Sequence, residues 1–311
     1  MIVSIDGVNN MKILVTGGAG FIGSNLVEEL VKKNSVIVLD NLHSGTLDNL
    51  KKVKNEVEFI NDSCNNIHKL KLPKVDIIFH LGIASSSPMY KENPLIVGDS
   101  INGTINVFEY AKKEKVKKVI FASSSSLYNG LQPPHNESMD IKVTDFYTEA
   151  RLCIERIAKL YNILYGVKTV GLRFFSVYGP HEEAKGKYAN IVTQFFWEMK
   201  KGNSPIIYGD GTQKRDFVFV KDIVKACLLL KNSEFDYDVF NVGTGKSYSF
   251  NDVVNILNGK LNLNIKPTYI EMPIKNYVDH TLADTRKIKY LGYQPEYSLE
   301  RGIDELLSAK I

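Results

Sequence analysis

The chain has 311 residues, of which 44% are hydrophobic and 24% charged, and its formal net charge is +4. This length allows one large or two modest domains with a buried core, and the composition is ordinary for a globular protein. The mild positive charge does not indicate nucleic-acid binding, because no groove-reading motif accompanies the lysines near residues 112–118.

Three cysteines, Cys64, Cys153 and Cys227, lie far apart and lack the close spacing of a zinc site or a disulfide framework. We therefore expect no metal site and a reducing compartment, with the cytoplasm as the location. Residues 1–10 are too short and too polar for a signal peptide and are a candidate dispensable extension. No apolar run approaches the length of a membrane span.

The first predicted strand, residues 12–16, runs into a glycine-rich turn that a helical pattern follows. Glycines at positions 17, 18, 20 and 23 fit two spacings of the dinucleotide fingerprint. They allow a tight turn and a close backbone approach, and the helix N-terminus suits a phosphate. The next strand ends at Asp40, where a carboxylate would bind a ribose diol. A tight turn without a ligand is the alternative, but the motif in this context predicts a dinucleotide site.

Further strands are predicted at residues 57–60, 75–81, 118–122 and 167–172, with helices at about 95–111 and 147–165. This alternation predicts an α/β fold with a doubly wound parallel sheet of the Rossmann type. Asp62 follows the third strand and is either an acceptor for an adenine amino group or an exposed turn residue. His80 stands in an apolar run, which favours a core histidine over a ligand or a base.

Glycine, proline and aromatic residues become more frequent beyond residue 175, which indicates a domain change there. Residues 1–175 are predicted to form the dinucleotide-binding domain. Residues 216–243 are predicted to return to it, because their last segment again has the pattern of a sheet strand. Residues 176–215 and 244–311 are predicted to form a smaller, mixed substrate domain.

Tyr147 and Arg151 lie four residues apart on a predicted helix and therefore share one face. A phenol is a poor base at neutral pH, but a cation one turn away favours its deprotonated form. Ser124, at the end of the fifth strand, could hydrogen-bond the same substrate hydroxyl. Each residue alone has an ordinary structural explanation, but beside a nicotinamide the three suit hydride abstraction from a secondary alcohol.

From residue 11 onward the chain resembles the extended short-chain dehydrogenase/reductase family, and within it the nucleotide-sugar epimerases of the UDP-glucose 4-epimerase type. The motifs that carry this resemblance are residues 16–23, Asp40-Asn41-Leu42, His80-Leu81, Ser123-Ser124 with Tyr128, Tyr147 to Glu155, Arg173 to Pro180, Gly209 to Asp222, Phe240 to Gly245 and Leu291 to Pro295.

The resemblance implies a reaction in which bound NAD takes hydride from C4 of a UDP-hexose while Tyr147 takes the hydroxyl proton. The 4-keto sugar then turns in the site, and hydride returns to its other face. The implied cofactor is NAD, because Asp40 would repel the 2′-phosphate of NADP. Arg215 is implied to hold the nucleotide pyrophosphate, for which a guanidinium is well shaped. A homodimer is also implied.

The resemblance also implies the residues of the site. The implied catalytic residues are Tyr147, Ser124 and Arg151. The implied cofactor contacts are Gly17, Gly20, Phe21, Ile22, Gly23, Asp40, Asn41, Asp62, Leu81, Ser100, Tyr147 and Arg151. The implied substrate contacts are Ser124, Ser125, Ser176, Asn190, Arg215 and Lys275.

Four positions depart from the family pattern. Arg151 replaces the lysine of the family's helix, and an arginine cannot join a lysine-type proton relay, so we expect a slowed enzyme. Ser100 and Ser176 stand where the family commonly has asparagine. An arginine that usually precedes the last substrate segment is missing, and Lys275 is its partial replacement as a point charge.

Related sugar dehydratases carry an acid after the serine or threonine position, but this chain has Ser125 and Ser126 there, which disfavours dehydration and decarboxylation. The leading hypothesis is therefore 4-epimerisation of UDP-glucose and UDP-galactose or of their N-acetylated or uronic-acid relatives. One alternative is a net nucleotide-sugar oxidoreductase of the same fold. Another is a nucleotide-sugar-binding protein in which Arg151 has weakened catalysis.

Overall fold

The computed structural model describes residues 10–272 and 277–309. Its centre is a seven-stranded sheet in the order β11-β6-β5-β4-β1-β2-β3, and every neighbouring pair of strands is parallel. The strands are β1 (Lys12–Thr16), β2 (Ser35–Asp40), β3 (Val57–Asn61), β4 (Ile77–His80), β5 (Lys118–Ser124), β6 (Thr169–Phe174) and β11 (Tyr237–Val242). The predicted doubly wound α/β fold is confirmed.

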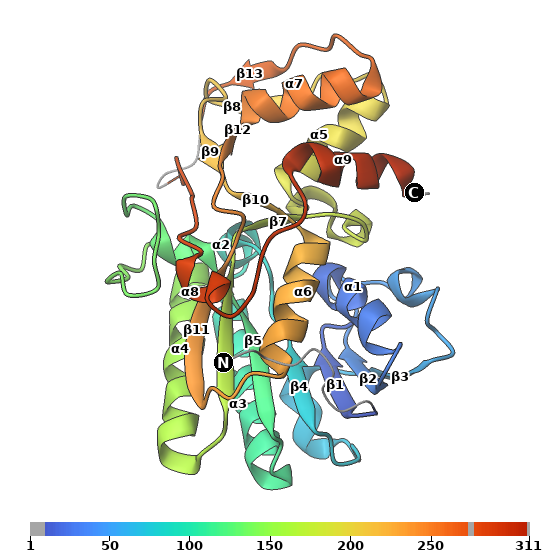
Figure 1. Ribbon diagram of the computed structural model, residues 1–311, viewed down its shortest axis with the longest axis vertical. Coiled ribbons are helices and arrows are strands. Elements are labelled where there is room, and N and C mark those ends of the chain that lie inside the picture. Colours follow the sequence, from blue (N-terminus) through green and yellow to red (C-terminus); the bar gives the residue numbers. More distant parts are fainter. Residues whose placement is uncertain (1–9, 273–276, 310–311) are drawn as a thin grey trace.

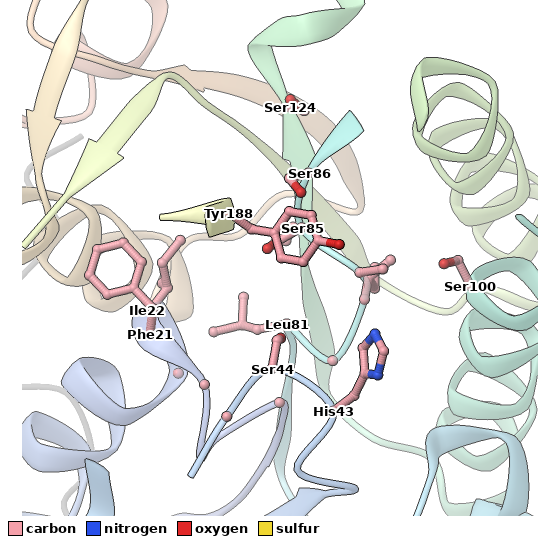
Figure 2. A pocket seen from close by; sticks show the side chains of 18 of the residues that line it. Phe21, Ile22, His43, Ser44, Leu81, Ser85, Ser86, Ser100, Ser124 and Tyr188 are labelled. Carbon is pink, nitrogen blue, oxygen red and sulfur yellow. The ribbon is translucent and has the colours of Figure 1, made fainter. Parts of the chain in front are cut away.

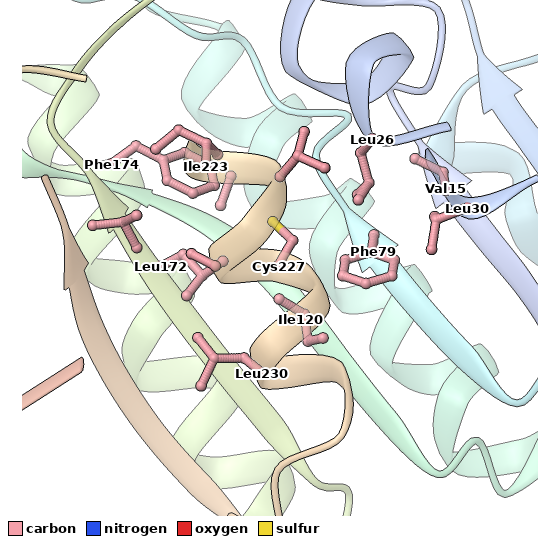
Figure 3. Packing of buried hydrophobic residues seen from close by; sticks show 14 of the residues in the cluster. Val15, Leu26, Leu30, Phe79, Ile120, Leu172, Phe174, Ile223, Cys227 and Leu230 are labelled. Atoms are coloured by element: carbon pink, nitrogen blue, oxygen red, sulfur yellow. The ribbon is translucent and has the colours of Figure 1, made fainter. Parts of the chain in front are cut away.

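Helices cover both faces of this sheet (Figure 1). Side chains of α1 (Phe21–Leu30) and α6 (Val220–Lys231) share one buried cluster with the sheet, which Figure 3 shows around Phe79, Ile120 and Cys227. Side chains of α3 (Ile96–Glu114) and α4 (Phe146–Tyr165) share a second cluster on the other face. The central strands are buried on both faces, which explains their nearly continuous apolar sequences.

A smaller layer of helices and short strands lies beyond the carboxyl ends of the strands, at the top of Figure 1. Its own apolar cluster joins three helices and the strand pair β7–β10. Its elements are β7 (Ser176–Tyr178), α5 (Ile191–Lys200), β8 (Ile206–Tyr208), β9 (Lys214–Arg215), β10 (Phe217–Phe219), β12 (Tyr248–Ser249), α7 (Phe250–Leu261), β13 (Thr268–Ile270) and α9 (Leu299–Ser308). Short elements complete the chain: η1 (Leu47–Leu50), η2 (Cys64–Lys69), α2 (Ser87–Glu92), η3 (Ser125–Tyr128), η4 (Glu183–Tyr188) and α8 (Arg286–Lys289).

Buried polar groups connect the two layers. The Asp216 carboxylate, which is fully buried, accepts hydrogen bonds from the backbone N–H groups of Thr244, Gly245 and Ala283 at 2.8–3.0 Å. Below them, Arg173 on β6 and Glu155 on α4 form a buried ion pair at 2.7 Å, and Ser123 donates to the same carboxylate at 2.6 Å. Breaking this ion pair leaves an uncompensated buried charge, so these contacts hold β6, α4 and the end of β5 in one arrangement.

No helix in the described part of the chain is long and apolar enough to cross a membrane. His80 is fully buried between the hydroxyls of Thr16 and Thr104, at 2.8 and 3.0 Å from its two ring nitrogens. Burial lowers the pKa of His80 to about 3, so its imidazole is neutral at physiological pH. The prediction of a core histidine is confirmed.

Candidate active site

A cavity of about 700 Å³ lies at the carboxyl ends of the sheet strands, between the sheet and the smaller layer. Its lining comes from the loops after β1 to β6, from α3 and α4, and from the segment that leads to α5. In the strand order, β1 lies between β4 and β2, so the chain reverses its direction of winding beside the cavity. Ligands bind at this topological switch point in open α/β sheets.

The glycine-rich turn forms one wall of the cavity with almost no room for side chains. A Cβ atom at Gly23 would lie 2.0 Å from the Gly17 carbonyl oxygen, and one at Gly17 would lie 2.6 Å from the Gly82 nitrogen. Gly17 also has a φ of +68°, which glycine adopts without strain. The turn delivers the N-terminus of α1 to the cavity with no acidic residue in its first turn, so a pyrophosphate fits here.

Asp40 lies beside this turn at the end of β2. Its carboxylate accepts hydrogen bonds from the backbone N–H groups of Ala19 at 2.9 Å and Leu42 at 2.8 Å. Burial raises the pKa of Asp40, and these backbone N–H groups oppose that rise. Asp40 therefore orients the glycine turn and also lines the cavity, where its carboxylate can face a ribose.

The other predicted cofactor contacts, Phe21, Ile22, Asn41, Asp62, Leu81 and Ser100, line the same cavity. Figure 2 shows Phe21, Ile22, Leu81 and Ser100 around it. One Asp62 oxygen already accepts from the N–H of Ser63 at 2.7 Å and from the Asn66 amide at 2.9 Å. The Ser100 hydroxyl lies 2.7 Å from the buried Tyr90 hydroxyl. These residues are distant in sequence, and the sheet topology brings them together at one edge of the sheet.

The predicted catalytic residues Tyr147, Ser124 and Arg151 also line this cavity. The Tyr147 hydroxyl donates to the Ser85 carbonyl oxygen at 3.3 Å, and the Arg151 Cζ lies 5.0 Å from the centre of the Tyr147 ring. Asp145 caps the helix that carries both residues, and Ser87 donates to the Asp145 carboxylate at 2.5 Å. Tyr147 is therefore held with its hydroxyl beside the loop after β4.

The Arg151 guanidinium is held in place by hydrogen bonds to the backbone. Its two terminal nitrogens donate to the carbonyl oxygens of Ala84 at 2.7 Å and Ala122 at 3.2 Å. Its Nε is buried and finds no partner among the described residues. The guanidinium thus bridges the ends of β4 and β5, and it supplies a fixed positive charge beside Tyr147.

The predicted substrate contacts Ser125, Ser176 and Asn190 also line the cavity. Ser124 accepts from the Ser126 N–H at 3.1 Å and caps the short helix after β5. Asn190 caps α5 by accepting from the Val192 N–H at 3.0 Å. In each case the side-chain oxygen accepts one backbone hydrogen bond, and Ser124 and Asn190 both remain in the cavity wall.

One predicted substrate residue, Arg215, is not in the cavity wall of the described structure. Arg215 donates to the carbonyl oxygens of Val278 and, at 3.1 Å, Asp279, and it lies between the rings of Phe250 and Tyr277. It is not among the residues that line the cavity. Lys275 lies outside the described residues.

Lys185 and Tyr188 are wall residues that the sequence analysis did not single out, and only the tertiary structure brings them to the cavity. Lys185 and Tyr188 belong to η4, and Ser86 follows β4 with a buried hydroxyl that has no partner among the described residues. Figure 2 shows the Tyr188 ring in the same view as Ser85 and Ser86. No motif in the sequence marks Lys185 or Tyr188.

The sequence profile of the NAD-dependent epimerase/dehydratase family matches residues 13–243. A curated protein of Methanocaldococcus jannaschii, named "Putative UDP-glucose 4-epimerase", is 36% identical over 304 residues, covering 95% of this chain and 97% of that protein.

Two solved structures are similar over nearly their whole length. The UDP-N-acetylglucosamine 4-epimerase of Methanobrevibacter ruminantium M1, in complex with UDP-N-acetylmuramic acid, has a TM-score of 0.90 and 32% identity, with 97% of this chain and 99% of that chain covered. The UDP-glucose 4-epimerase of Thermotoga maritima, with UDP-glucose, has a TM-score of 0.90 and 32% identity, with 96% and 97% covered.

Proposed function

Because this chain belongs to the NAD-dependent epimerase/dehydratase family, we propose that it interconverts the C4 epimers of a UDP-hexose. The observation that carries the proposal is the meeting of Tyr147, Arg151 and Ser124 in one cavity with the glycine turn. A hydroxyl base, a fixed cation and a dinucleotide cradle are the groups that oxidation and reduction at a secondary alcohol require.

The cofactor is NAD. The glycine turn and Asp40 would hold it, and it would supply a hydride acceptor and donor for C4 of the sugar. The positive charge of Arg151 stabilises the phenolate of Tyr147, which takes the proton of the 4-hydroxyl and becomes a neutral phenol. Ser124 hydrogen-bonds the same substrate oxygen. The Asp40 carboxylate binds the adenosine ribose and disfavours a 2′-phosphate.

Hydroxyl groups, not carboxyl groups, occupy the cavity wall after Ser124. Ser125 and Ser126 begin η3 there, and neither can serve as the acid that elimination of water needs. We therefore propose that the sugar keeps its substituents and changes only its configuration.

On the substrate side, we assign sugar contacts to Ser125, Ser176 and Asn190. Arg215 is the proposed ligand of the UDP pyrophosphate. Since its guanidinium now donates to backbone carbonyls, this role requires it to exchange at least one of those hydrogen bonds for a phosphate. Lys275 is the second proposed cation.

The proposal is tested by incubating the purified protein with UDP-galactose, UDP-glucose and their N-acetylated and uronic-acid forms, and separating the products. Conversion within one epimer pair supports 4-epimerisation and identifies the sugar. Stoichiometric NADH with a keto product would instead identify a net oxidoreductase, and binding of NAD and UDP without any turnover would identify a weakened binding protein.

The remaining expectations are also proposals. We propose a homodimer, because α4 exposes Leu160, Ile163 and Leu164 by 52–64% on its outer surface. Leu152, earlier on the same helix, is buried within the chain. We further propose a cytoplasmic enzyme that does not bind nucleic acid or membranes, with a cofactor domain of residues 1–175 and 216–243.

A further inference from the structure

The segment that leads to α5 lines the cavity and carries two lysines, Lys185 and Lys187. Both belong to η4, and Gly186 between them has a φ of +50° and ψ of −121°. The kink at Gly186 turns the chain, so the side chains of Lys185 and Lys187 have different surroundings. Lys187 is exposed and forms an ion pair with Glu92 at 2.7 Å. Lys185 is half-buried and lines the cavity.

The Lys185 ammonium lies at the phosphate end of the dinucleotide cradle. Its Nζ is 5.2 Å from the centre of the Phe21 ring, and Phe21 is the first residue of α1, directly after the glycine turn. Among the described residues Lys185 has no ion pair with a carboxylate, although its charge acts on the buried Glu182 nearby. A half-buried ammonium that only faces an aromatic ring keeps hydrogen-bond donors free for a ligand.

The charges around the cavity leave a phosphate-bearing ligand in need of a positive charge near the start of α1. Three carboxylates, Asp40, Asp62 and Asp99, line its cofactor side, and they oppose the binding of an anion. The guanidinium of Arg151 already donates to two carbonyl oxygens. A dinucleotide brings two phosphate charges to the start of α1, where the backbone N–H groups and the helix dipole neutralise only part of them. Within the described cavity lining, Lys185 can supply a full positive charge to neutralise the rest of the phosphate charge.

The segment holds Lys185 in place from both sides. The neighbouring His181 lies with its Nδ1 2.9 Å from the Ser24 hydroxyl of α1. On the other side, Tyr188 donates to Glu92 at 2.5 Å, and Tyr188 packs against the cluster that contains Tyr147. The ammonium is therefore presented toward α1 by a segment attached to both walls of the cavity.

We propose that Lys185 is a binding residue for the pyrophosphate of NAD and that it helps retain the cofactor through the catalytic cycle. The inference rests on the NAD site of the proposed function but not on the identity of the sugar. A UDP pyrophosphate offers the same chemistry, but the contact with Phe21 at the glycine turn favours the cofactor.

The test compares Lys185→Met and Lys185→Gln with the matched control Lys187→Met in the full-length protein freed of nucleotide. The dissociation constants of NAD and of UDP are measured by calorimetry, and thermal unfolding without ligand verifies that each variant is folded. Both Lys185 variants are expected to bind NAD about tenfold more weakly, the effect of one partly screened charge-assisted hydrogen bond. Their UDP affinity should equal that of the wild type, and Lys187→Met should bind both ligands as the wild type does.

Salt gives a second readout. Raising NaCl from about 50 to about 500 mM should weaken NAD binding less in the Lys185 variants than in the wild type, because they lack one screened ionic contact. Unchanged NAD affinity in both Lys185 variants would overturn the proposal. So would an equal loss in Lys187→Met, which would indicate a general effect of the segment, or a loss confined to UDP. Absence of epimerase activity would count against the proposed function and leave these binding results intact.

Discussion

Glu182 predicts an unusual dependence of stability on pH. Its side chain is fully buried, one carboxylate oxygen accepts from the Asn190 N–H at 2.6 Å, and the other has no partner among the described residues. Burial raises the pKa of this carboxyl group from 4.5 to about 7, because the charged form is poorly solvated there. Above pH 7 the folded protein must hold a buried carboxylate.

The direction in which stability changes with pH follows from the difference in the pKa of Glu182 between the folded and the unfolded state. The pKa is higher in the folded state than in the unfolded state, so stability from this group is fully present below pH 4.5 and is lost as pH rises through about 7. A pKa difference of one between the two states corresponds to about 1.4 kcal/mol, so the free energy of unfolding is lower by about 3 kcal/mol at pH 8. In Glu182→Gln the amide cannot ionise, and its oxygen can still accept from Asn190.

The assay is urea unfolding of the ligand-free wild type, Glu182→Gln and the control Glu183→Gln at several pH values from about 5 to about 8. The free energy of unfolding of Glu182→Gln should rise relative to the wild type across this range by about 2–3 kcal/mol. The exposed neighbour Glu183 provides the matched control, and its variant should follow the wild type. If Glu182→Gln also runs parallel to the wild type, the carboxyl group is already ionised at low pH and the reasoning is wrong.

Three further predictions concern the cavity. Tyr147→Phe should lower kcat by about 10²–10⁴-fold, because it removes the proton acceptor, and should weaken NAD binding far less, because it removes a single cofactor contact. An equal loss of NAD binding in calorimetry would contradict the catalytic role. Arg151→Lys should raise kcat several-fold, since an ammonium can leave the carbonyls of Ala84 and Ala122 for a ligand hydroxyl, and steady-state rates with the converted sugar test it. Gly23→Ala should abolish NAD binding, because its Cβ would lie 2.0 Å from the Gly17 oxygen and force the turn to move, and wild-type NAD affinity in this variant would show that the turn is not the cradle.

Local pattern was enough to predict the sheet. The strand before the glycine turn, the strand that ends at Asp40 and the helix that carries Tyr147 are continuous in sequence, and each has its own periodicity. Boundaries moved by a few residues: the predicted helix at 95–111 extends over Ile96–Glu114, and the strand predicted from residue 75 begins at Ile77. Helix ends depend on caps and on the neighbouring packing, which periodicity does not record.

The cavity wall was predictable only in part, for a physical reason. Residues that follow parallel strands share one edge of the sheet, so Asp40, Leu81 and Ser124 could be expected near one another. The surroundings of Arg215 could not be predicted in this way. Its guanidinium donates to backbone carbonyls of a segment that lies more than sixty residues later in the chain.

The sequence by itself determined the family, the α/β fold and the NAD cradle, because the glycines and Asp40 act through backbone geometry within a short stretch of chain. Only the tertiary structure decided which charges face the cavity. Lys185, Tyr188 and Glu182 carry no motif, and their importance comes from a kinked segment that packs between α1 and α2. Burial and electrostatic contact arise between segments distant in sequence, so no local pattern could have identified them.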